Sequence, residues 1–347
     1  MSETPPRRWL AVALLGVCAI GATGCLPSRV VIDLAPGDGR LVETVVLADA
    51  GAGGSGPKIA LIDVTGLISH TPGGGLIAGR ASAVDSLVAR LAKAEQDPLV
   101  RAVVLRVNSP GGTVAASETV YHEVRRFRQA TSKPVVVSMA EVAASGGYYL
   151  SLAADRIVAQ PTTITGSIGV ILQTVNFSQG MARLGIEARA VTSGPNKDLA
   201  NPLTPAREGH YGILQGQVDE FYASFRALVL ERRPALSPAD AQWATDGRVM
   251  TGARAHEAGL VDELGGVRDA FASARRLAGV ERARLVKYHA QGAEPRSPYS
   301  TTGPTVPPSA AGGTEINMIQ LNLPEGLLPT AGFYYVWTPG IEGLPGR

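Results

Sequence analysis

Short apolar runs and amphipathic segments alternate through the middle of the chain. The apolar runs are rich in β-branched residues, which predicts buried strands. The expected strands are residues 59–64, 100–107, 135–139, 157–159, 168–172 and 188–191. Apolar residues at helical spacing predict helices over 81–93, 114–130 and 148–154. Strands that are apolar throughout and alternate with helices indicate an α/β fold with a largely parallel sheet.

Three further helices are expected in the second half of the chain. A long amphipathic pattern covers residues 205–233 and is followed by a proline. Ser237 with Pro238 behind it is a helix start signal, because proline suits the first helical position. Residues 267–277 predict a closing helix. The folded body is therefore expected to occupy residues 58–280.

The residues from 281 to 347 are expected to form a C-terminal extension. Its stretch 291–313 consists largely of Ser, Thr, Pro, Gly and Ala, with little to bury, which predicts a mobile segment. Apolar content returns in the tail at 316–328 and 333–337. Such a tail can return to the body as a strand or dock on a partner, and the sequence leaves both open.

The N-terminus has the layout of a secretory signal. Arg7 and Arg8 precede an apolar run over 9–22, which is short for a transmembrane helix. The small residues before Cys25 resemble the lipobox of bacterial lipoproteins, in which this cysteine is lipidated. Residues 1–24 are therefore expected to be a signal peptide with a lipobox. The alternatives are an uncleaved anchor and an ordinary secretory signal.

This N-terminus predicts an exported, membrane-anchored protein that faces the periplasm or the cell exterior. Residues 25–57 are expected to be a flexible tether, because they end in Gly-Ala-Gly-Gly-Ser-Gly-Pro. The net charge of +2, with 18% charged residues, gives no indication of a nucleic-acid partner. The two cysteines both lie in the first 25 residues, which excludes a cysteine nucleophile or thiolate metal site in the body.

A Gly-Gly turn follows the predicted strand 100–107. Its sequence is Val-Asn-Ser-Pro-Gly-Gly, residues 107–112, and a predicted helix follows. In parallel α/β proteins, ligands bind where strands end and helices begin. Two glycines there let a substrate approach the backbone closely and offer N–H groups to a carbonyl oxygen. The alternative is a plain turn between a strand and a helix.

Ser145 lies in a second turn of this kind. The sequence Ala-Ala-Ser-Gly-Gly-Tyr-Tyr, residues 143–149, follows the predicted strand 135–139 and leads into a helix. A serine in this setting can expose its hydroxyl as a nucleophile, with the N–H of Gly146 placed to receive an oxyanion. The alternative is that Ser145 only caps the helix.

A nucleophilic serine requires a base within hydrogen-bond reach. The chain has five histidines, and none lies in a Gly-rich turn. A Ser-His-Asp triad stays possible, because its members are neighbours in space rather than in sequence. A lysine can serve instead if desolvation lowers its pKa. Lys197 lies in a loop, Ser-Gly-Pro-Asn-Lys-Asp, where a solvated surface lysine is the alternative.

Five short motifs together indicate a resemblance to one family. They are V-N-S-P-G-G at 107–112, A-S-G-G-Y-Y at 144–149, A-A-D-R-I-V-A at 153–159, G-S-I-G-V at 166–170 and S-G-P-N-K-D at 193–198. In this order and spacing, the chain from about residue 58 to 280 resembles the signal peptide peptidase A family of bacterial serine peptidases, in its short single-repeat form.

The resemblance implies roles for four residues. Ser145 would be the nucleophile and Lys197 the general base, while Gly112 and Gly146 would supply backbone donors to the oxyanion. It also implies a Clp protease/crotonase-like fold, a spiral of ββα units with stacked, largely parallel sheets. In the short forms the protomers form a ring, and the lysine comes from the neighbouring protomer.

The function implied is a membrane-anchored serine endopeptidase that hydrolyses leader (signal) peptides or other membrane-derived peptides through an acyl-enzyme. The expected partners are a peptide substrate, a lipid membrane through lipidated Cys25 and further copies in a ring; no cofactor or metal is expected. One alternative is a catalytically inactive scaffold lipoprotein, against which the presence of both Ser145 and Lys197 argues. The other is a crotonase-like acyl-CoA enzyme, against which export argues.

Overall fold

The computed structural model describes residues 41–71, 81–301 and 333–337. The predicted signal peptide, Cys25 and residues 302–332 lie outside the described residues. Among the helices that are described, none has the length and hydrophobicity needed to cross a membrane.

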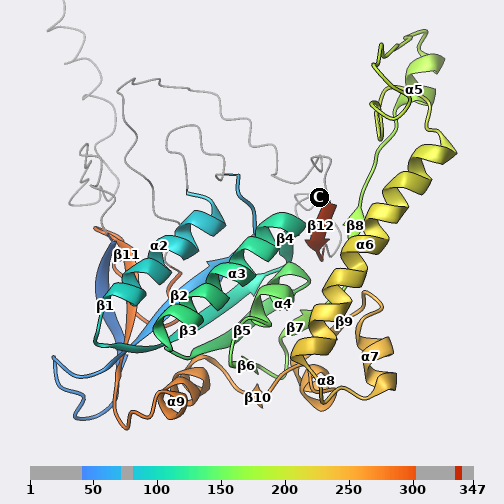
Figure 1. Cartoon of the computed structure of the whole chain (residues 1–347). Coiled ribbons are helices and arrows are strands. Elements are labelled where there is room, and N and C mark those ends of the chain that lie inside the picture. The colour runs from blue at the N-terminus through green and yellow to red at the C-terminus, as the bar shows by residue number, and fades with distance from the viewer. Residues whose placement is uncertain (1–40, 72–80, 302–332, 338–347) are drawn as a thin grey trace, which may run out of the picture. The chain divides into compact units, whose positions relative to one another are not determined.

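The apolar runs form a large sheet at the centre of the described chain (Figure 1). Its strands, in spatial order, are β1 (Leu41–Ala48), β11 (Arg284–Ala290), β2 (Lys58–Thr65), β3 (Val100–Ser109), β5 (Val135–Ala144), β6 (Arg156–Ala159) and β10 (Glu263–Leu264). Every neighbouring pair is parallel except β1 with β11. Two short strands extend it: β7 (Ile164–Gly166) pairs with the end of β5, and β9 (Val249–Thr251) pairs with β7. The predicted α/β class with a largely parallel sheet is confirmed.

Helices cover both faces of this sheet. The described helices are α2 (Ala83–Gln96), α3 (Val114–Thr131), α4 (Gly146–Ser151), α5 (Ser178–Arg183), α6 (Glu208–Arg232), α7 (Pro238–Ala244), α8 (Gly252–Glu257) and α9 (Val267–Leu277). Alternate residues of each strand point to opposite faces. Thus Ala60 and Ile62 of β2 pack in the cluster that contains the apolar faces of α2 and α3, whereas Ile59 and Leu61 pack against α9.

Most of the predicted elements are present, with small shifts at their ends. The predicted strand at 188–191 is wrong: these residues belong to no strand, and Val191 is fully exposed. A short apolar run becomes a strand only when a neighbouring strand takes up its backbone hydrogen bonds, and none of the described strands pairs with this run. The predicted strand at 168–172 is reduced to β8 (Ile171–Leu172).

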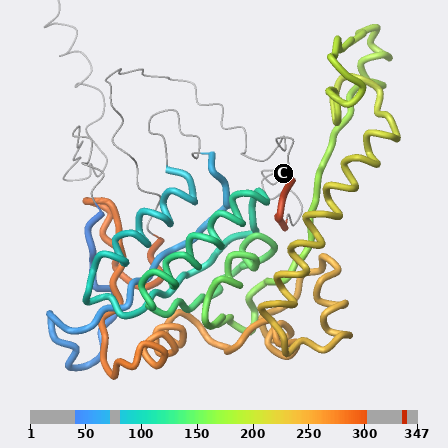
Figure 2. The backbone as a smooth tube through the Cα atoms, viewed as in Figure 1, coloured from blue at the N-terminus to red at the C-terminus, as the bar shows by residue number. Residues whose placement is uncertain are grey.

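Two strands of the large sheet lie outside the predicted body of residues 58–280. β1 comes from the segment predicted to be a tether, and β11 from the segment predicted to be an extension. They lie side by side, and β11 is inserted between β1 and β2 (Figures 1 and 2). The sheet therefore begins earlier in the chain, and ends later, than the hydrophobic pattern indicates.

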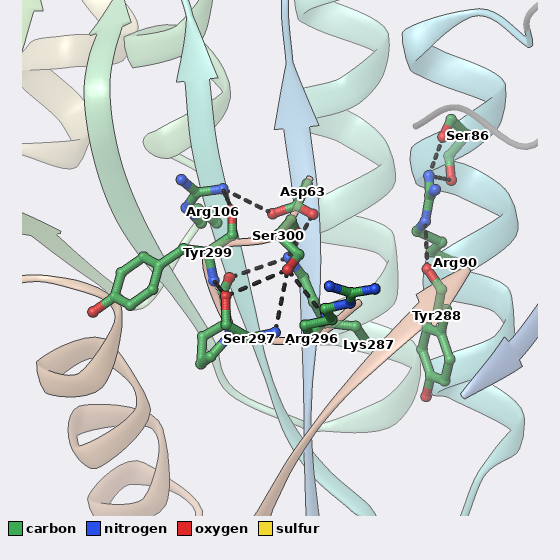
Figure 3. Close-up of polar contacts among 11 residues, drawn as sticks. Asp63, Ser86, Arg90, Arg106, Lys287, Tyr288, Arg296, Ser297, Tyr299 and Ser300 are labelled. Atoms are coloured by element: carbon green, nitrogen blue, oxygen red, sulfur yellow. Dashed lines mark hydrogen bonds and ion pairs between the residues drawn. The ribbon is translucent and has the colours of Figure 1, made fainter. Parts of the chain in front are cut away.

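A buried charge cluster joins β2, β3 and β11 to the segment that follows β11 (Figure 3). Lys287 is fully buried, and its Nζ lies 2.7 Å from Oδ2 of Asp63, whose Oδ1 lies 3.5 Å from a guanidinium nitrogen of Arg106. Burial lowers the pKa of Lys287, although the Asp63 carboxylate opposes this effect. Lys287 also donates to the carbonyls of Pro298 and Ser300. The cluster therefore fixes residues 298–300 against the sheet.

A second, three-stranded sheet lies next to α3 and α4. β4 (Gly111–Thr113) and β8 form its edges, and β12 (Phe333–Val336) lies between them, antiparallel to both. The tail predicted to return as a strand or dock on a partner thus returns as a strand within the same chain.

Candidate active site

The two Gly-Gly turns of the sequence meet at one edge of the large sheet. β3 and β5 are parallel neighbours, and Ser109 at the end of β3 pairs with Ala143 near the end of β5. The carboxyl ends of parallel neighbours lie together, where α/β proteins commonly bind their ligands. The turn 110–113 and the turn at Ser145 are therefore adjacent, as the strand order predicts.

Ser145 occupies a sharp turn between β5 and α4. Its backbone has φ 53° and ψ −113°, outside the regions that non-glycine residues ordinarily adopt. Two backbone hydrogen bonds hold it there: its N–H donates to Gly166 O at 2.8 Å, and its carbonyl accepts from the N–H of Tyr149 at 2.8 Å. Strained backbone of this kind persists where the surroundings enforce it, and it is concentrated at functional sites.

The alternative role for Ser145, as a helix cap, is wrong. Ser145 precedes α4, but its side chain makes no capping hydrogen bond. The residue is only 1% exposed. The Ser145 hydroxyl thus lies at the start of α4 but accepts no hydrogen bond from the first N–H groups of the helix.

Gly112 and Gly146 lie against each other beside Ser145. A methyl group built on Gly146 would lie 3.1 Å from the Gly112 nitrogen and 2.4 Å from Ser117 Oγ. One built on Gly112 would lie 1.9 Å from Ile68 O. The backbone of Ile68 leaves room only for glycine at 112, and a side chain at 146 would require Ser117 to move. The backbones of both glycines can approach a bound carbonyl closely. This arrangement is suited to two N–H donors for one oxyanion, which stays a prediction.

The G-S-I-G-V motif supports the turn that contains Ser145. Gly166 has φ 81° and supplies the carbonyl that receives the Ser145 N–H. Ser167 has φ 50°, and its N–H donates to Arg248 O at 2.7 Å. The motif therefore holds the Ser145 turn in place through a backbone hydrogen bond.

An aromatic cluster next to this turn was missed by the sequence analysis. The Tyr149 ring lies 5.5 Å from the ring of Tyr121 on α3 and 4.9 Å from that of Phe225 on α6. Burial raises the pKa of Tyr149 to about 12, so its hydroxyl stays protonated at neutral pH. The signal available in the sequence was the pair Tyr148-Tyr149 directly after the glycines, but its partners come from distant segments.

Lys197 is not brought to Ser145 within the protomer. Lys197 is exposed, in a loop at the N-terminal end of α6, where His210 bonds to Pro195 O at 3.0 Å. Phe225 makes the contact of α6 with Tyr149 and lies 15 residues after His210 in the same helix. At 1.5 Å per residue this is about 22 Å along the helix, and Figure 1 shows α5 and its loops at the end of α6 remote from α4.

The polar contacts of four histidines are with groups other than Ser145: His70 and His289 bond to the hydroxyls of Thr119 and Thr44. His122 is on α3, where it lies 3.7 Å from Glu118, and His210 is near Asp198 at the start of α6. Among the residues that the structure describes, no group of three or more His, Cys, Asp or Glu side chains could hold a metal ion.

Comparison with known proteins identifies the family. A family model described as peptidase family S49 matches residues 127–281. A putative signal peptide peptidase SppA of Enterococcus faecium is 30% identical over 298 residues, covering 81% of this chain and 84% of the relative. The chain belongs to peptidase family S49. The resemblance to the signal peptide peptidase A family is thereby confirmed.

Other S49 relatives differ in length from this chain. Protease 4 of Salmonella typhi is 38% identical over 239 residues, which cover 67% of this chain but 37% of that protein. The chain thus matches just over a third of the length of that relative. A solved structure of the 1510-N membrane-bound stomatin-specific protease is similar with a TM-score of 0.42 and 14% identity, covering 63% of this chain and 84% of that one.

Proposed function

We propose that this S49 protein is a serine endopeptidase that hydrolyses leader peptides or other membrane-derived peptides, with Ser145 as nucleophile. The single observation that carries the proposal is the strained turn at Ser145, with the backbones of Gly112 and Gly146 beside it. A hydroxyl held in this way, next to two N–H donors, is suited to attack on a peptide carbonyl.

The proposed reaction has two steps. The amine of Lys197 takes the proton from Ser145 Oγ as Oγ attacks the carbonyl carbon, and the oxyanion is stabilised by Gly112 and Gly146. The C–N bond then breaks, the amine leaves with the proton, and an acyl-enzyme remains on Ser145. Water, deprotonated by Lys197, attacks the ester, releases the acid and restores the serine.

We further propose that Lys197 comes from a neighbouring protomer. The loop that contains it lies about 22 Å along α6 from the contact with Tyr149. Nine of the fifteen large apolar side chains exposed in the described part of the chain lie between residues 171 and 213, around this loop. Exposed apolar side chains gathered in one segment favour a protein interface. A ring of protomers would cover them and bring each Lys197 to the next Ser145.

The membrane anchor is also a proposal. Lipidation of Cys25 would tether the enzyme to the outer face of a membrane, in the periplasm or at the cell exterior, close to membrane-derived peptides. Leader peptides are the substrate class that fits both this location and the family of the chain.

Covalent labelling tests the central assignment. The purified protein should be phosphonylated by a serine-directed fluorophosphonate, with loss of fluoride, and the labelled tryptic peptide should contain Ser145. Ser145→Ala should not be labelled, whereas Ser138→Ala, which changes a buried serine of β5, the strand before Ser145, should be labelled like the wild type. Labelling at another serine, or none at all in the assembled oligomer, would contradict the proposal and favour an inactive scaffold.

A further inference from the structure

The loop that contains Lys197 has no regular secondary structure of its own. Residues 184–207, between α5 and α6, belong to no described helix or strand (Figure 1). Two short-range bonds bend the loop near the lysine: the N–H of Lys197 donates to Gly194 O at 3.3 Å, and that of Asn201 donates to Asp198 O at 3.1 Å. Because no helix or ladder fixes this backbone, the position of Lys197 depends on contacts between the loop and its surroundings.

His210 on α6 makes one such contact, two residues before Lys197. Its Nε2 lies 3.0 Å from Pro195 O. A carbonyl oxygen only accepts hydrogen bonds, so Nε2 carries the hydrogen and donates it. Of residues 208–213, which begin the helix, only His210 is buried. The start of α6 thus directs one polar side chain inward, onto the backbone of the loop.

Asp198, the residue after Lys197, makes a second contact with the start of α6. Its carboxylate pairs with the guanidinium of Arg207, the residue that precedes the helix. The same carboxylate has Oδ1 3.9 Å from Nε2 of His210. Its side chain is 16% exposed, so water screens it less than a fully exposed carboxylate. The loop is therefore held to α6 on both sides of Lys197.

The part of the loop that follows Asp198 is fixed to the segment before α5. The side-chain amide of Asn176 donates to Thr204 O at 2.7 Å, and the N–H of Phe177 donates to Pro202 O at 2.7 Å. These bonds limit the freedom of the loop between Asp198 and α6. Lys197 therefore lies between fixed points, of which the bond from His210 is the nearest on its N-terminal side.

A lysine that acts as a base benefits from a fixed backbone. Its long side chain loses rotamer freedom when the amine is aligned with a hydroxyl. A misplacement of about 1 Å can lower the rate about a hundredfold. Functional residues on loops are accordingly positioned by a rigid scaffold. α6, with 25 residues the longest of the described helices, is such a scaffold for this loop.

We propose that His210 is a positioning residue of the peptidase: by binding Pro195 O beside the Asp198–Arg207 pair, it fixes the loop that presents Lys197 to Ser145. This inference rests on the proposed function, in which Lys197 is the base. His210 takes no proton from substrate or serine, and it acts on the reaction only through the loop.

Hydrolysis of a quenched peptide by the full chain gives the first test. His210→Ala should lower kcat at least about tenfold and change KM less than about twofold, because the lysine is misplaced while peptide binding is kept. His210→Gln should retain most of kcat, since its amide can donate to the same carbonyl. His289→Ala, which removes a buried, hydrogen-bonded histidine of β11, should leave kcat unchanged. Equal losses of kcat in the two alanine variants would overturn the proposal.

Mixed rings show on which chain His210 acts. Rings of Ser145→Ala and Lys197→Ala chains should form active sites from the serine of one chain and the lysine of the next. Adding His210→Ala to the Ser145→Ala chain, which supplies the lysine, should lower hydrolysis at least about tenfold. Adding it to the Lys197→Ala chain should leave hydrolysis unchanged, because that chain has no lysine to position. An equal loss in both placements would reveal a general structural effect and overturn the proposal.

Hydrogen exchange measures the hold of His210 on the loop without catalysis. Amides of residues 193–201 should exchange at least about tenfold faster in His210→Ala than in the wild type or His210→Gln, because the loop loses a bond to α6. If no form hydrolyses peptides but this result is found, the proposed function fails and the hold of His210 on the loop stands. If the wild type hydrolyses peptides and His210→Ala has the same kcat, the positioning role fails and the proposed function stands.

Discussion

Single residues show where this protein departs from ordinary backbone geometry. Ser145 is held with positive φ by hydrogen bonds from two different segments, and close contacts favour glycine at 112 and 146. A backbone conformation like that of Ser145 costs about 1–3 kcal/mol and persists only where the surroundings enforce it. The concentration of these positions at one edge of the sheet marks that edge as the functional one.

Removing the hydroxyl of Ser145 should stop hydrolysis. Ser145→Ala is expected to lower kcat at least about a thousandfold, because no other group can form the acyl-enzyme. The fold should be preserved, since the hydroxyl makes no capping bond. The measurement is hydrolysis of a quenched peptide, with Ser138→Ala as the matched buried control. Turnover of Ser145→Ala near that of the wild type would remove the serine from the mechanism.

A methyl group at Gly112 should damage both stability and activity. In Gly112→Ala the new carbon would meet Ile68 O at 1.9 Å, so the turn must shift. Overpacking of this kind costs about 1–3 kcal/mol of unfolding free energy, and the shift moves the N–H assigned to the oxyanion. Urea unfolding measures the first effect and kcat the second. Gly216→Ala on α6, where nothing lies within 4 Å, should show neither effect.

At the scale of elements, buried polar contacts decide how segments remote in sequence are joined. β11 enters the sheet with Lys287 fully buried, and the Asp63 carboxylate compensates its charge. Lys287 also holds the segment after β11. The pair thus connects the sheet to the root of the tail that ends in β12.

Breaking the Lys287–Asp63 pair should lower the unfolding free energy of the protein. Lys287→Met leaves the Asp63 carboxylate buried without its closest cation, and the expected loss of unfolding free energy is about 3–5 kcal/mol. Urea unfolding measures the loss, and hydrogen exchange at residues 298–300 should rise. Arg189→Met breaks an exposed ion pair with Glu187 and should have almost no effect. A similarly small effect of Lys287→Met would show that the pair is not structurally important.

At the scale of the whole molecule, one protomer holds the parts of the proposed site far apart. Ser145 lies at the edge of the sheet, and Lys197 lies in an exposed loop at the other end of α6. In the proposed ring, a neighbouring copy covers the apolar side chains that are exposed around that loop. Activity should therefore require assembly.

Mixing two inactive variants tests this requirement. When Ser145→Ala and Lys197→Ala chains are coexpressed in equal amounts, about a quarter of the sites in random rings combine an intact serine with an intact lysine from the next protomer. Peptide hydrolysis should reach about that fraction of the wild-type rate, while each variant alone stays inactive. Native mass spectrometry confirms the mixing. Mixed rings without activity would mean that both residues act within one chain.

The sequence by itself determined the succession of strands and helices in the core, and the family. Its apolar runs are buried on both faces, so each predicts a central strand without knowledge of its neighbours. The turns at Gly112 and Ser145 each follow a predicted strand and precede a predicted helix, which is where parallel α/β proteins bind ligands. The five motifs identified the family without the structure, because each is a short run of consecutive residues.

Only the tertiary structure decided the features that depend on distant partners. The positive φ of Ser145 is imposed by a carbonyl of Gly166, and the insertion of β11 beside β2 depends on a buried ion pair. β12 is a strand because β4 and β8 take up its backbone hydrogen bonds and an aromatic cluster accepts Tyr335. Local periodicity contains no information on such pairings, since their free energy comes from contacts between segments far apart in the chain.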